Sequence, residues 1–346
     1  MESHDLSAAG LTRLLHQAGS LPRGSVVSVR VDHREQTWVS ELTFLHVAYS
    51  SDAPSGLPAA LLVKWPRSGS DDAASASRTE VDFYARVGPS LPAPPRVRCL
   101  AALDEGSGVS VLILEDLRGG FDHPAWADAP SRDQCNAALA ALAQVHAHWW
   151  QHPSLGNTIG TWHTEAGLRQ MIAGISAHLP AFFAAVGDSL PGGVRGVIER
   201  VFGSSLQPWL RIVDRQALTL VHGDAHASNF LFPRSGASPA YLLDWQLWHL
   251  DVGARDVAFQ IGLHWPASRR RELEGDLLHY YHGQLIQRGV PDYPFDELLL
   301  DYRRCLVRNL TVPIIFWARG MGPEHWRDRL DHAVSAYLDH DCDALL

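Results

Sequence analysis

The feature that most constrains the fold of this chain is a change in sequence texture near residue 118. Before that point, strand-like apolar runs alternate with turn-rich segments, at residues 25–32, 37–49 and 58–65. After it, the strongly helical segment 134–150 begins a remainder with one short strand-like stretch, within 218–250. This order predicts a small lobe that holds most of the strands, followed by a larger and mainly helical lobe.

Local patterns predict further elements of the first lobe. The first ~20 residues form an amphipathic helix, and residues 78–87 also have helical spacing. Residues 94–117 form two strands joined by a Gly/Ser turn, and the second strand is nearly all apolar, which predicts a central place in the sheet. The turn of the first hairpin is predicted at residues 32–37.

Composition limits the kind of protein. The 346 residues include 46% hydrophobic side chains and 12 Trp, enough to bury the cores of two lobes and to exclude a disordered chain. No apolar run approaches the roughly 18–20 residues of a membrane span, and the N-terminus does not resemble a signal peptide. We therefore expect a cytoplasmic protein with no membrane partner. The four scattered cysteines form no CxxC pair, which disfavours a disulfide framework or structural zinc.

The net charge of −9 is unevenly distributed, with −2 on residues 1–114 and −7 on residues 115–346. The acidic second part would repel a nucleic-acid backbone, so no nucleic-acid partner is expected. It would suit a cationic ligand, although a solvated acidic surface is the commoner cause. The same two interpretations apply to Asp339, Asp341 and Asp343 at the C-terminus.

Of the 29 basic residues, 28 are Arg and only Lys64 is Lys. Lys64 ends an apolar strand, and Glu80 follows on the predicted helix. Arg is a planar fork, whereas Lys is a compact point charge on a thin stem, which suits a phosphate pocket between strands. Kinase-type folds hold the α- and β-phosphates with a strand lysine that pairs with a helix glutamate.

The segment HGDAHASN (222–229) places Asp224 just after an apolar strand and Asn229 five residues later. Kinases use this spacing for phosphoryl transfer, in which the Asp orients the attacking hydroxyl and accepts its proton and the Asn holds Mg²⁺. A second carboxylate, Asp244, ends an apolar run and would bridge Mg²⁺ to the β- and γ-phosphates. The alternative is that all three side chains serve only as turn and cap residues.

His222 and His226 flank Asp224 and allow a different interpretation. A His-x-Asp-x-His cluster would suit a transition metal and a metal-dependent hydrolase, but no further ligand stands at a suitable spacing. We favour His222 as a buried scaffold residue that bonds the loop backbone, and His226 as a brace near Asp224.

Together these motifs resemble the aminoglycoside phosphotransferase and choline kinase superfamily, and most closely its bacterial ecdysteroid-kinase-like members. The catalytic motifs are specific, and the resemblance covers nearly the whole chain. The segments that carry it are LVKW (62–65), TEVDFYARV (79–87), LILEDL (112–117), LAQVHAHWW (142–150), VHGDAHASNFLF (221–232), LLDWQ (242–246), RDVAF (255–259) and RRCLVRNLTVPIIFW (303–317).

The resemblance implies an α+β, bilobal protein-kinase-like fold with a small mixed N-lobe (1–114), a hinge (115–120) and a larger, mainly helical C-lobe (121–346). It also implies ATP or GTP as the phosphoryl donor and Mg²⁺ as the cofactor. The partners would be a nucleoside triphosphate and a hydroxylated small molecule, with the protein a monomer or homodimer.

The resemblance also assigns roles to single residues. Asp224 would be the catalytic base, and Asn229 and Asp244 would be the Mg²⁺ ligands. Lys64 would contact phosphate and be held by Glu80. The nucleotide base would meet the backbones of Glu115 and Leu117.

One departure from the family concerns the first hairpin, which has no Gly-rich phosphate loop. Nucleotide contacts there would have to come from side chains such as Thr37 or Ser40, or from backbone amides.

The sequence thus predicts a small-molecule O-phosphotransferase that modifies an antibiotic or related natural product, in resistance or in biosynthetic tailoring. Two other interpretations within the same fold are a catalytically silent nucleotide-binding protein and a choline- or sterol-type metabolic kinase.

Overall fold

The structure is a computed structural model that describes residues 5–91, 94–104, 110–125, 129–204, 207–234 and 239–346. The chain divides into two compact units. The first comprises Met1–His123 and Asn229–Trp248, and the second comprises Pro124–Ser228 and His249–Leu346. The predicted lobe boundaries and the hinge at 115–120 stay predictions. Among the described residues, no helix is both long and apolar enough to cross a bilayer.

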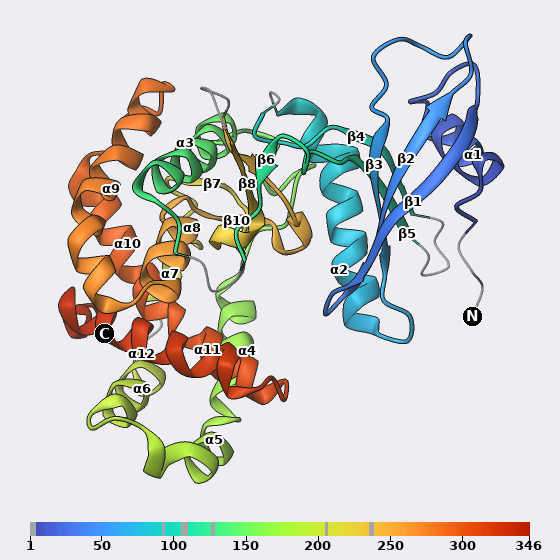
Figure 1. The fold of residues 1–346 in the computed structure, drawn as a ribbon. Helices are drawn as coiled ribbons and strands as arrows, with labels where there is room; N and C mark the ends of the chain where they lie inside the picture. Colours follow the sequence, from blue (N-terminus) through green and yellow to red (C-terminus); the bar gives the residue numbers. More distant parts are fainter. Residues whose placement is uncertain (1–4, 92–93, 105–109, 126–128, 205–206, 235–238) are drawn as a thin grey trace. The chain divides into compact units, whose positions relative to one another are not determined.

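The first unit is built on a five-stranded sheet in which every neighbouring pair is antiparallel (Figure 1). The strand order is β1-β2-β3-β5-β4. The strands are β1 (Val26–Gln36), β2 (Ser40–Tyr49), β3 (Ala60–Pro66), β4 (Cys99–Asp104) and β5 (Ser110–Glu115). The apolar strand β5 lies between two others, as predicted, because it can bury both of its faces.

The first hairpin turns later than the sequence predicts. Residues 32–36 continue β1, Gln36 pairs with Glu41, and the Thr37 N–H donates to the Ser40 carbonyl at 2.8 Å. The predicted turn at 32–37 is therefore wrong. Its polar residues belong to an edge strand that is mostly exposed, where no apolar pattern is needed.

Two helices pack against this sheet. Helix α1 (Ala8–Gln17) is capped by Ser7, whose hydroxyl accepts a hydrogen bond from the Gly10 N–H. It buries Leu11 and Leu15 in the hydrophobic core that it shares with the sheet. Helix α2 (Asp71–Asp82) lies against β3, β4 and β5 and continues into a π-helical turn, Phe83–Val87.

The segment Asn229–Trp248 packs with the first unit although it lies far away in the sequence. Its strands β8 (Phe230–Pro233) and β9 (Tyr241–Leu242) pair with each other, and β8 pairs with β6 (Phe121–Asp122). The Trp245 ring stacks on Phe83 with centroids 3.9 Å apart, and the Trp248 indole donates to the Thr79 carbonyl at 3.0 Å. These two contacts attach the turn after Asp244 to helix α2 and to the π-helical turn that follows it.

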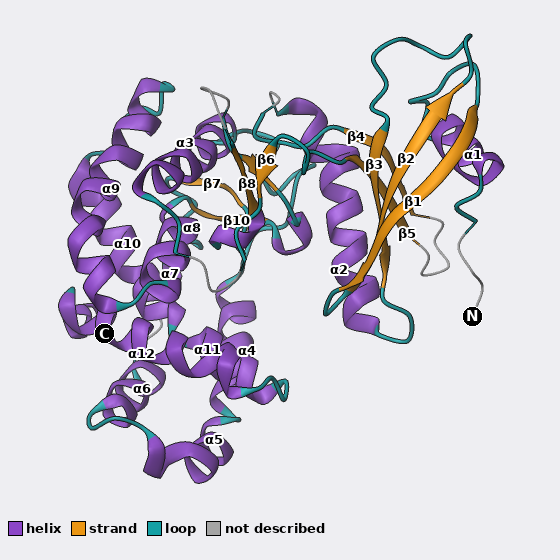
Figure 2. Ribbon diagram, viewed as in Figure 1, coloured by secondary structure: helices purple, strands orange, loops and turns teal. Residues whose placement is uncertain are grey.

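The second unit is mainly helical, and its described residues form one antiparallel strand pair (Figure 2). That pair is β7 (Leu218–Val221) and β10 (His249–Val252). The helices are α3 (Arg132–His148), α4 (Glu165–Ser176), α5 (Leu179–Val186), α6 (Val194–Gly203), α7 (Gln207–Leu210), α8 (Ala254–Ala258), α9 (Ala267–Gln287), α10 (Phe295–Asn309), α11 (Thr311–Ala318) and α12 (Pro323–Asp339). Helices α3 and α9 pack side by side, and α10 contacts α8 and α12.

The C-terminal acids are held in ion pairs. Asp339 pairs with Arg270 and with Arg271, and Asp343 pairs with Arg200 at 2.8 Å. Asp339 and Asp343 stay exposed while they form these pairs, so both are surface acids that also hold arginines.

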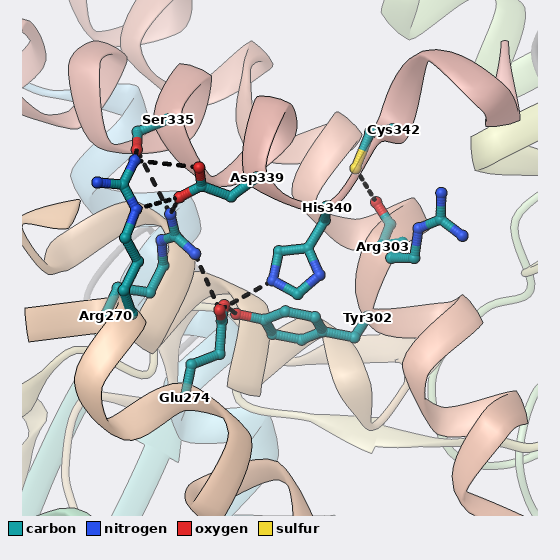
Figure 3. A network of polar contacts seen from close by, with 9 residues as sticks. Arg270, Glu274, Tyr302, Arg303, Ser335, Asp339, His340 and Cys342 are labelled. Atoms are coloured by element: carbon teal, nitrogen blue, oxygen red, sulfur yellow. Dashed lines mark hydrogen bonds and ion pairs between the residues drawn. The ribbon is translucent and has the colours of Figure 1, made fainter. Parts of the chain in front are cut away.

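Glu274 of α9 extends this network into the interior (Figure 3). Its carboxylate accepts from Arg270 at 2.9 Å and from the Tyr302 hydroxyl at 2.6 Å, and His340 lies 2.8 Å away. Arg270 is only 1% exposed, so its charge is compensated by these partners instead of by water. The network joins α9, α10 and α12.

Replacing Arg270 tests how much this buried charge contributes to stability. We expect Arg270→Met to lower the free energy of unfolding by about 3–5 kcal/mol, because it removes the buried cation that pairs with the buried Glu274 carboxylate. Arg271→Met is the matched control, since Arg271 pairs with the same Asp339 but has a 59% exposed side chain. Arg271→Met should lower the free energy of unfolding by less than about 1 kcal/mol. Urea denaturation measures both, and equal losses would show that burial of Arg270 is unimportant.

Candidate functional site

Lys64 lies on β3 between two carboxylates of the first unit. Its ammonium nitrogen is 2.6 Å from a Glu80 carboxylate oxygen and also forms an ion pair with Asp244. Lys64 is 8% exposed and Glu80 is 2% exposed. Burial by itself would lower the pKa of Lys64, but the charges of Asp244 and Glu80 outweigh it and raise that pKa above its usual range. Lys64 therefore stays protonated.

Asp244 occupies a special place in the backbone. It follows β9 with φ of +63°, a left-handed conformation that Asp tolerates better than most residues. Its second carboxylate oxygen accepts from the Gln246 side-chain amide at 2.8 Å. Gln246 was not singled out from the sequence, and only its place two residues after Asp244 could have suggested the contact.

The β8–β9 pairing brings Asn229 and Asp244 to the same end of one hairpin. Phe230 pairs with Leu242, and the Leu243 N–H donates to the Asn229 carbonyl at 2.9 Å. An amide oxygen and a carboxylate are the hard oxygen donors that Mg²⁺ takes together with phosphate oxygens and water. The two residues therefore fit a Mg²⁺ site that a nucleotide helps to complete.

Thr37 and Ser40 close the β1–β2 turn and bond to each other. The Thr37 hydroxyl oxygen accepts from the Ser40 N–H at 3.0 Å, and Ser40 is 2% exposed. The backbones of Glu115 and Leu117 are each partly engaged. The Glu115 N–H donates to the Arg98 carbonyl at 2.9 Å, and the Leu117 carbonyl accepts from the Gly120 N–H at 3.1 Å.

The loop that carries Asp224 belongs to the second unit and begins after β7. The Asp224 N–H donates to Nδ1 of His222 at 3.3 Å. His222 is fully buried, and Nε2 of His226 lies 3.5 Å from an Asp224 carboxylate oxygen. Both histidines thus have the bracing positions that the sequence suggests. Among the described residues, no three His, Cys, Asp or Glu side chains are placed to hold one metal ion.

Asp256, at the start of α8, bonds to the backbone of this loop and holds it in place. Its carboxylate accepts from the N–H groups of His222 at 2.7 Å and Gly223 at 2.8 Å, and Nε2 of His146 lies 3.1 Å away. Gly223 has φ of +81°, a conformation that glycine adopts without strain and that lets two consecutive N–H groups point at one carboxylate.

The environment keeps Asp256 ionised. Burial by itself would raise its pKa, but the hydrogen bond and charge of His146, and then the nearby His222, hold that pKa below its usual value. The Tyr281 hydroxyl lies 2.7 Å from Nδ1 of His146 and completes the chain of contacts. The sequence resemblance included RDVAF (255–259), but no local pattern indicated that its acid would bond the loop backbone.

Comparison with known protein families identifies a family that this chain resembles over most of its length. The model of the phosphotransferase enzyme family matches residues 49–298 of the chain. No curated protein sequence is similar enough to count as a match.

Several solved structures share the fold at low sequence identity. A candidate aminoglycoside phosphotransferase from Ralstonia eutropha has a TM-score of 0.58 at 13% identity, over 96% of this chain and 97% of its own. Aminoglycoside 2'-phosphotransferase-IIIa, bound to GDP, has a TM-score of 0.56 at 13% identity, over 96% and 99%. An amicoumacin kinase has a TM-score of 0.51 at 10% identity, over 89% and 88%. The predicted fold class is thereby confirmed.

We expect Asp256→Asn to lower the free energy of unfolding by about 2–4 kcal/mol at pH 7. The amide keeps one acceptor oxygen for three donors and turns its NH₂ group toward an N–H. Amide hydrogen exchange at His222 and Gly223 should be faster in this variant than in the wild type.

The stability that Asp256 contributes should depend on pH. Because the folded-state pKa of Asp256 is depressed, this contribution is complete above the unfolded pKa of about 3.9 and is lost as the pH falls through the folded value. The difference in the free energy of unfolding between wild type and Asp256→Asn should therefore become smaller below about pH 4.

Asp276→Asn is the control for this prediction, since Asp276 pairs with Arg132 on the surface and its side chain is 67% exposed. It should change stability by less than about 1 kcal/mol. Unchanged exchange at His222 and Gly223 in Asp256→Asn would contradict the anchoring role.

Proposed function

The chain belongs to the phosphotransferase enzyme family, and from that membership we propose that it moves the γ-phosphoryl group of ATP or GTP to a hydroxyl of a small molecule. The acceptor would be an antibiotic or a related natural product, and the protein a resistance or tailoring kinase of the cytoplasm. Two neighbours in fold support this choice, one crystallised with GDP and one with AMP-PNP and amicoumacin. The closer likeness to ecdysteroid-kinase-like members is part of the same proposal.

The observation that carries the proposal is the buried cluster of Lys64, Glu80 and Asp244. A single lysine with two carboxylates has one acid in excess, so one carboxylate can leave the ammonium without unpairing it. Glu80 would keep Lys64 in place on β3. Asp244 would be free to hold a metal ion, and Lys64 would contact phosphate oxygens.

Asn229 and Asp244 would hold Mg²⁺ at their shared hairpin end. When bound, Mg²⁺ supplies positive charge that neutralises the phosphate oxygens. Gln246 would keep the Asp244 carboxylate oriented through its 2.8 Å hydrogen bond.

Asp224 would position the acceptor hydroxyl and take its proton. Phosphoryl transfer needs little covalent catalysis by the protein, so the rate acceleration comes from the orientation of the reactants and from electrostatic stabilisation. His226 would limit rotation of the carboxylate, and Asp256 would fix the backbone on which Asp224 stands.

Hydrogen bonds within the first unit suggest which backbone groups a nucleotide base would use. The Glu115 N–H and the Leu117 carbonyl are already bonded, so the base would use the Glu115 carbonyl and the Leu117 N–H. Thr37 and Ser40 would contact phosphates from the β1–β2 turn, in place of a Gly-rich loop.

Asp224→Asn tests the catalytic base. We expect phosphoryl transfer to pooled hydroxylated compounds, with Mg²⁺ and ATP or GTP, to fall by at least roughly 10³-fold, because the amide cannot accept the proton. Nucleotide binding should stay nearly intact. Mass spectrometry of the pools and nucleotide titration measure the two quantities. Wild-type turnover by the variant would exclude this base, and nucleotide binding without any wild-type product would favour the catalytically silent alternative.

Lys64→Arg tests the fit of the phosphate contact. We expect kcat/KM for the nucleotide to fall by roughly 10²-fold or more, because a planar fork does not fit a slot between Glu80 and Asp244 that holds a point charge. Arg67→Lys, outside the cluster, is the control for an Arg–Lys exchange near this strand. Unchanged kcat/KM in Lys64→Arg with both ATP and GTP would contradict the assignment.

A further inference from the structure

A cavity of about 450 Å³ lies in the second unit beside the loop that carries Asp224. His226 and Ser228 of that loop form one wall, and Trp265 and Arg269 form another. Residues at the N-terminal half of α12, including Arg329, close a third side. The volume falls in the range of small-molecule sites, and the cavity is lined by residues of the loop that carries the proposed base.

Arg269 is the distinctive group in this cavity. One of its terminal nitrogens donates to the Pro130 carbonyl and approaches Cys135 Sγ at 3.8 Å, and its guanidinium carbon lies 5.0 Å from the centroid of the Trp265 ring. Its Nε is buried and has no hydrogen-bond partner, and no carboxylate pairs with it among the described residues.

Its neighbours on α9 behave differently. Arg270 and Arg271 both form ion pairs with Asp339. Three consecutive arginines therefore divide into two that are compensated within the protein and one that faces a cavity without a carboxylate partner in the described chain. A half-buried cation of this kind is most stable when a bound anion completes it.

The other residues that line the cavity offer few groups that could bind a positively charged amine. Burial lowers the pKa of His264 and of His332, which keeps both imidazoles neutral near pH 7. The two acids among the described lining residues, Glu324 and Asp328, are exposed, and Glu324 already lies 3.4 Å from His325. The less exposed part of the lining thus offers the guanidiniums of Arg269 and Arg329 together with imidazoles, and the two carboxylates of the lining are on its exposed side.

We propose that this cavity binds the phosphoryl acceptor and that the acceptor carries an anionic oxygen group, which Arg269 holds over Trp265. The inference rests on the proposed function. A guanidinium fork matches a carboxylate or a phosphate with two parallel hydrogen bonds. The acceptor is then a hydroxylated natural-product acid whose hydroxyl reaches the Asp224–Ser228 loop. Polycationic aminoglycosides and choline-like alcohols are the wrong charge class for this wall.

The test uses hydroxylated natural-product acids, each in three forms. The forms are the free carboxylate, its neutral methyl ester and its cationic 2-aminoethyl amide, with a phosphate monoester added where the scaffold allows. Binding to the whole protein is measured by calorimetric titration and saturation-transfer NMR, and phosphoryl transfer by mass spectrometry. The phosphate form shows which anionic group the cavity prefers.

Arg269→Gln is the test variant, and Arg271→Gln is its matched control on the same helix. We expect Arg269→Gln to weaken binding of the carboxylates by roughly 10- to 100-fold, the usual size of a charged hydrogen-bonding pair, and to leave the esters unchanged. Arg271→Gln should leave all forms unchanged. Unchanged thermal unfolding of Arg269→Gln would exclude a folding defect.

The outcomes separate this inference from the proposed function. Asp224-dependent phosphorylation of cationic forms, with no effect of Arg269→Gln, would overturn the anionic acceptor while leaving the kinase intact. Carboxylates that bind through Arg269 but are never phosphorylated would support the cavity and contradict the kinase. If no carboxylate binds more tightly than its ester, the inference fails whatever the activity.

Discussion

The structure of the first unit depends on the burial of one ammonium group between two carboxylates. Lys64 comes from β3, Glu80 from α2 and Asp244 from the segment after β9. A buried charge without a partner would be strongly unfavourable, so these three elements are held in one arrangement. The stacking of Trp245 on Phe83 adds an apolar contact to the same junction. A residue 180 positions away from Lys64 in the chain is thereby fixed to the sheet.

The second unit uses a carboxylate for a similar purpose. Asp256 satisfies two consecutive N–H groups of the Asp224 loop and stays ionised because His146 lies against it. In one unit, acids fix a cation, and in the other an acid fixes backbone donors. In both, the side chain that we propose for chemistry is oriented by a neighbour that has no chemical step of its own.

The distribution of charge changes how the acidity of the chain should be interpreted. The net charge of −7 on residues 115–346 suggested a cationic ligand. In the structure, Asp251 pairs with Arg308, Asp301 with Arg211, and Asp339 with two arginines, so much of this acidity is compensated internally. The cavity beside the Asp224 loop presents Arg269 instead. Net charge therefore reports the average surface, whereas specificity depends on which charge is left without a partner inside a cavity.

The sequence by itself determined the order of the elements and the identity of the chemically able side chains. Apolar periodicity placed the strands and helices, and the spacing of Asp224 and Asn229 depends only on one short loop, because both are properties of neighbouring residues. The tertiary structure decided the pairings: Asp244 with Lys64, Asp256 with the loop backbone, and Asp339 with Arg270 and Arg271 but not with Arg269. It also placed the first turn at residues 38–39, because an exposed edge strand needs no apolar pattern. Among 28 arginines and 38 acids, no local pattern states which ones meet, since that depends on which helix faces pack together.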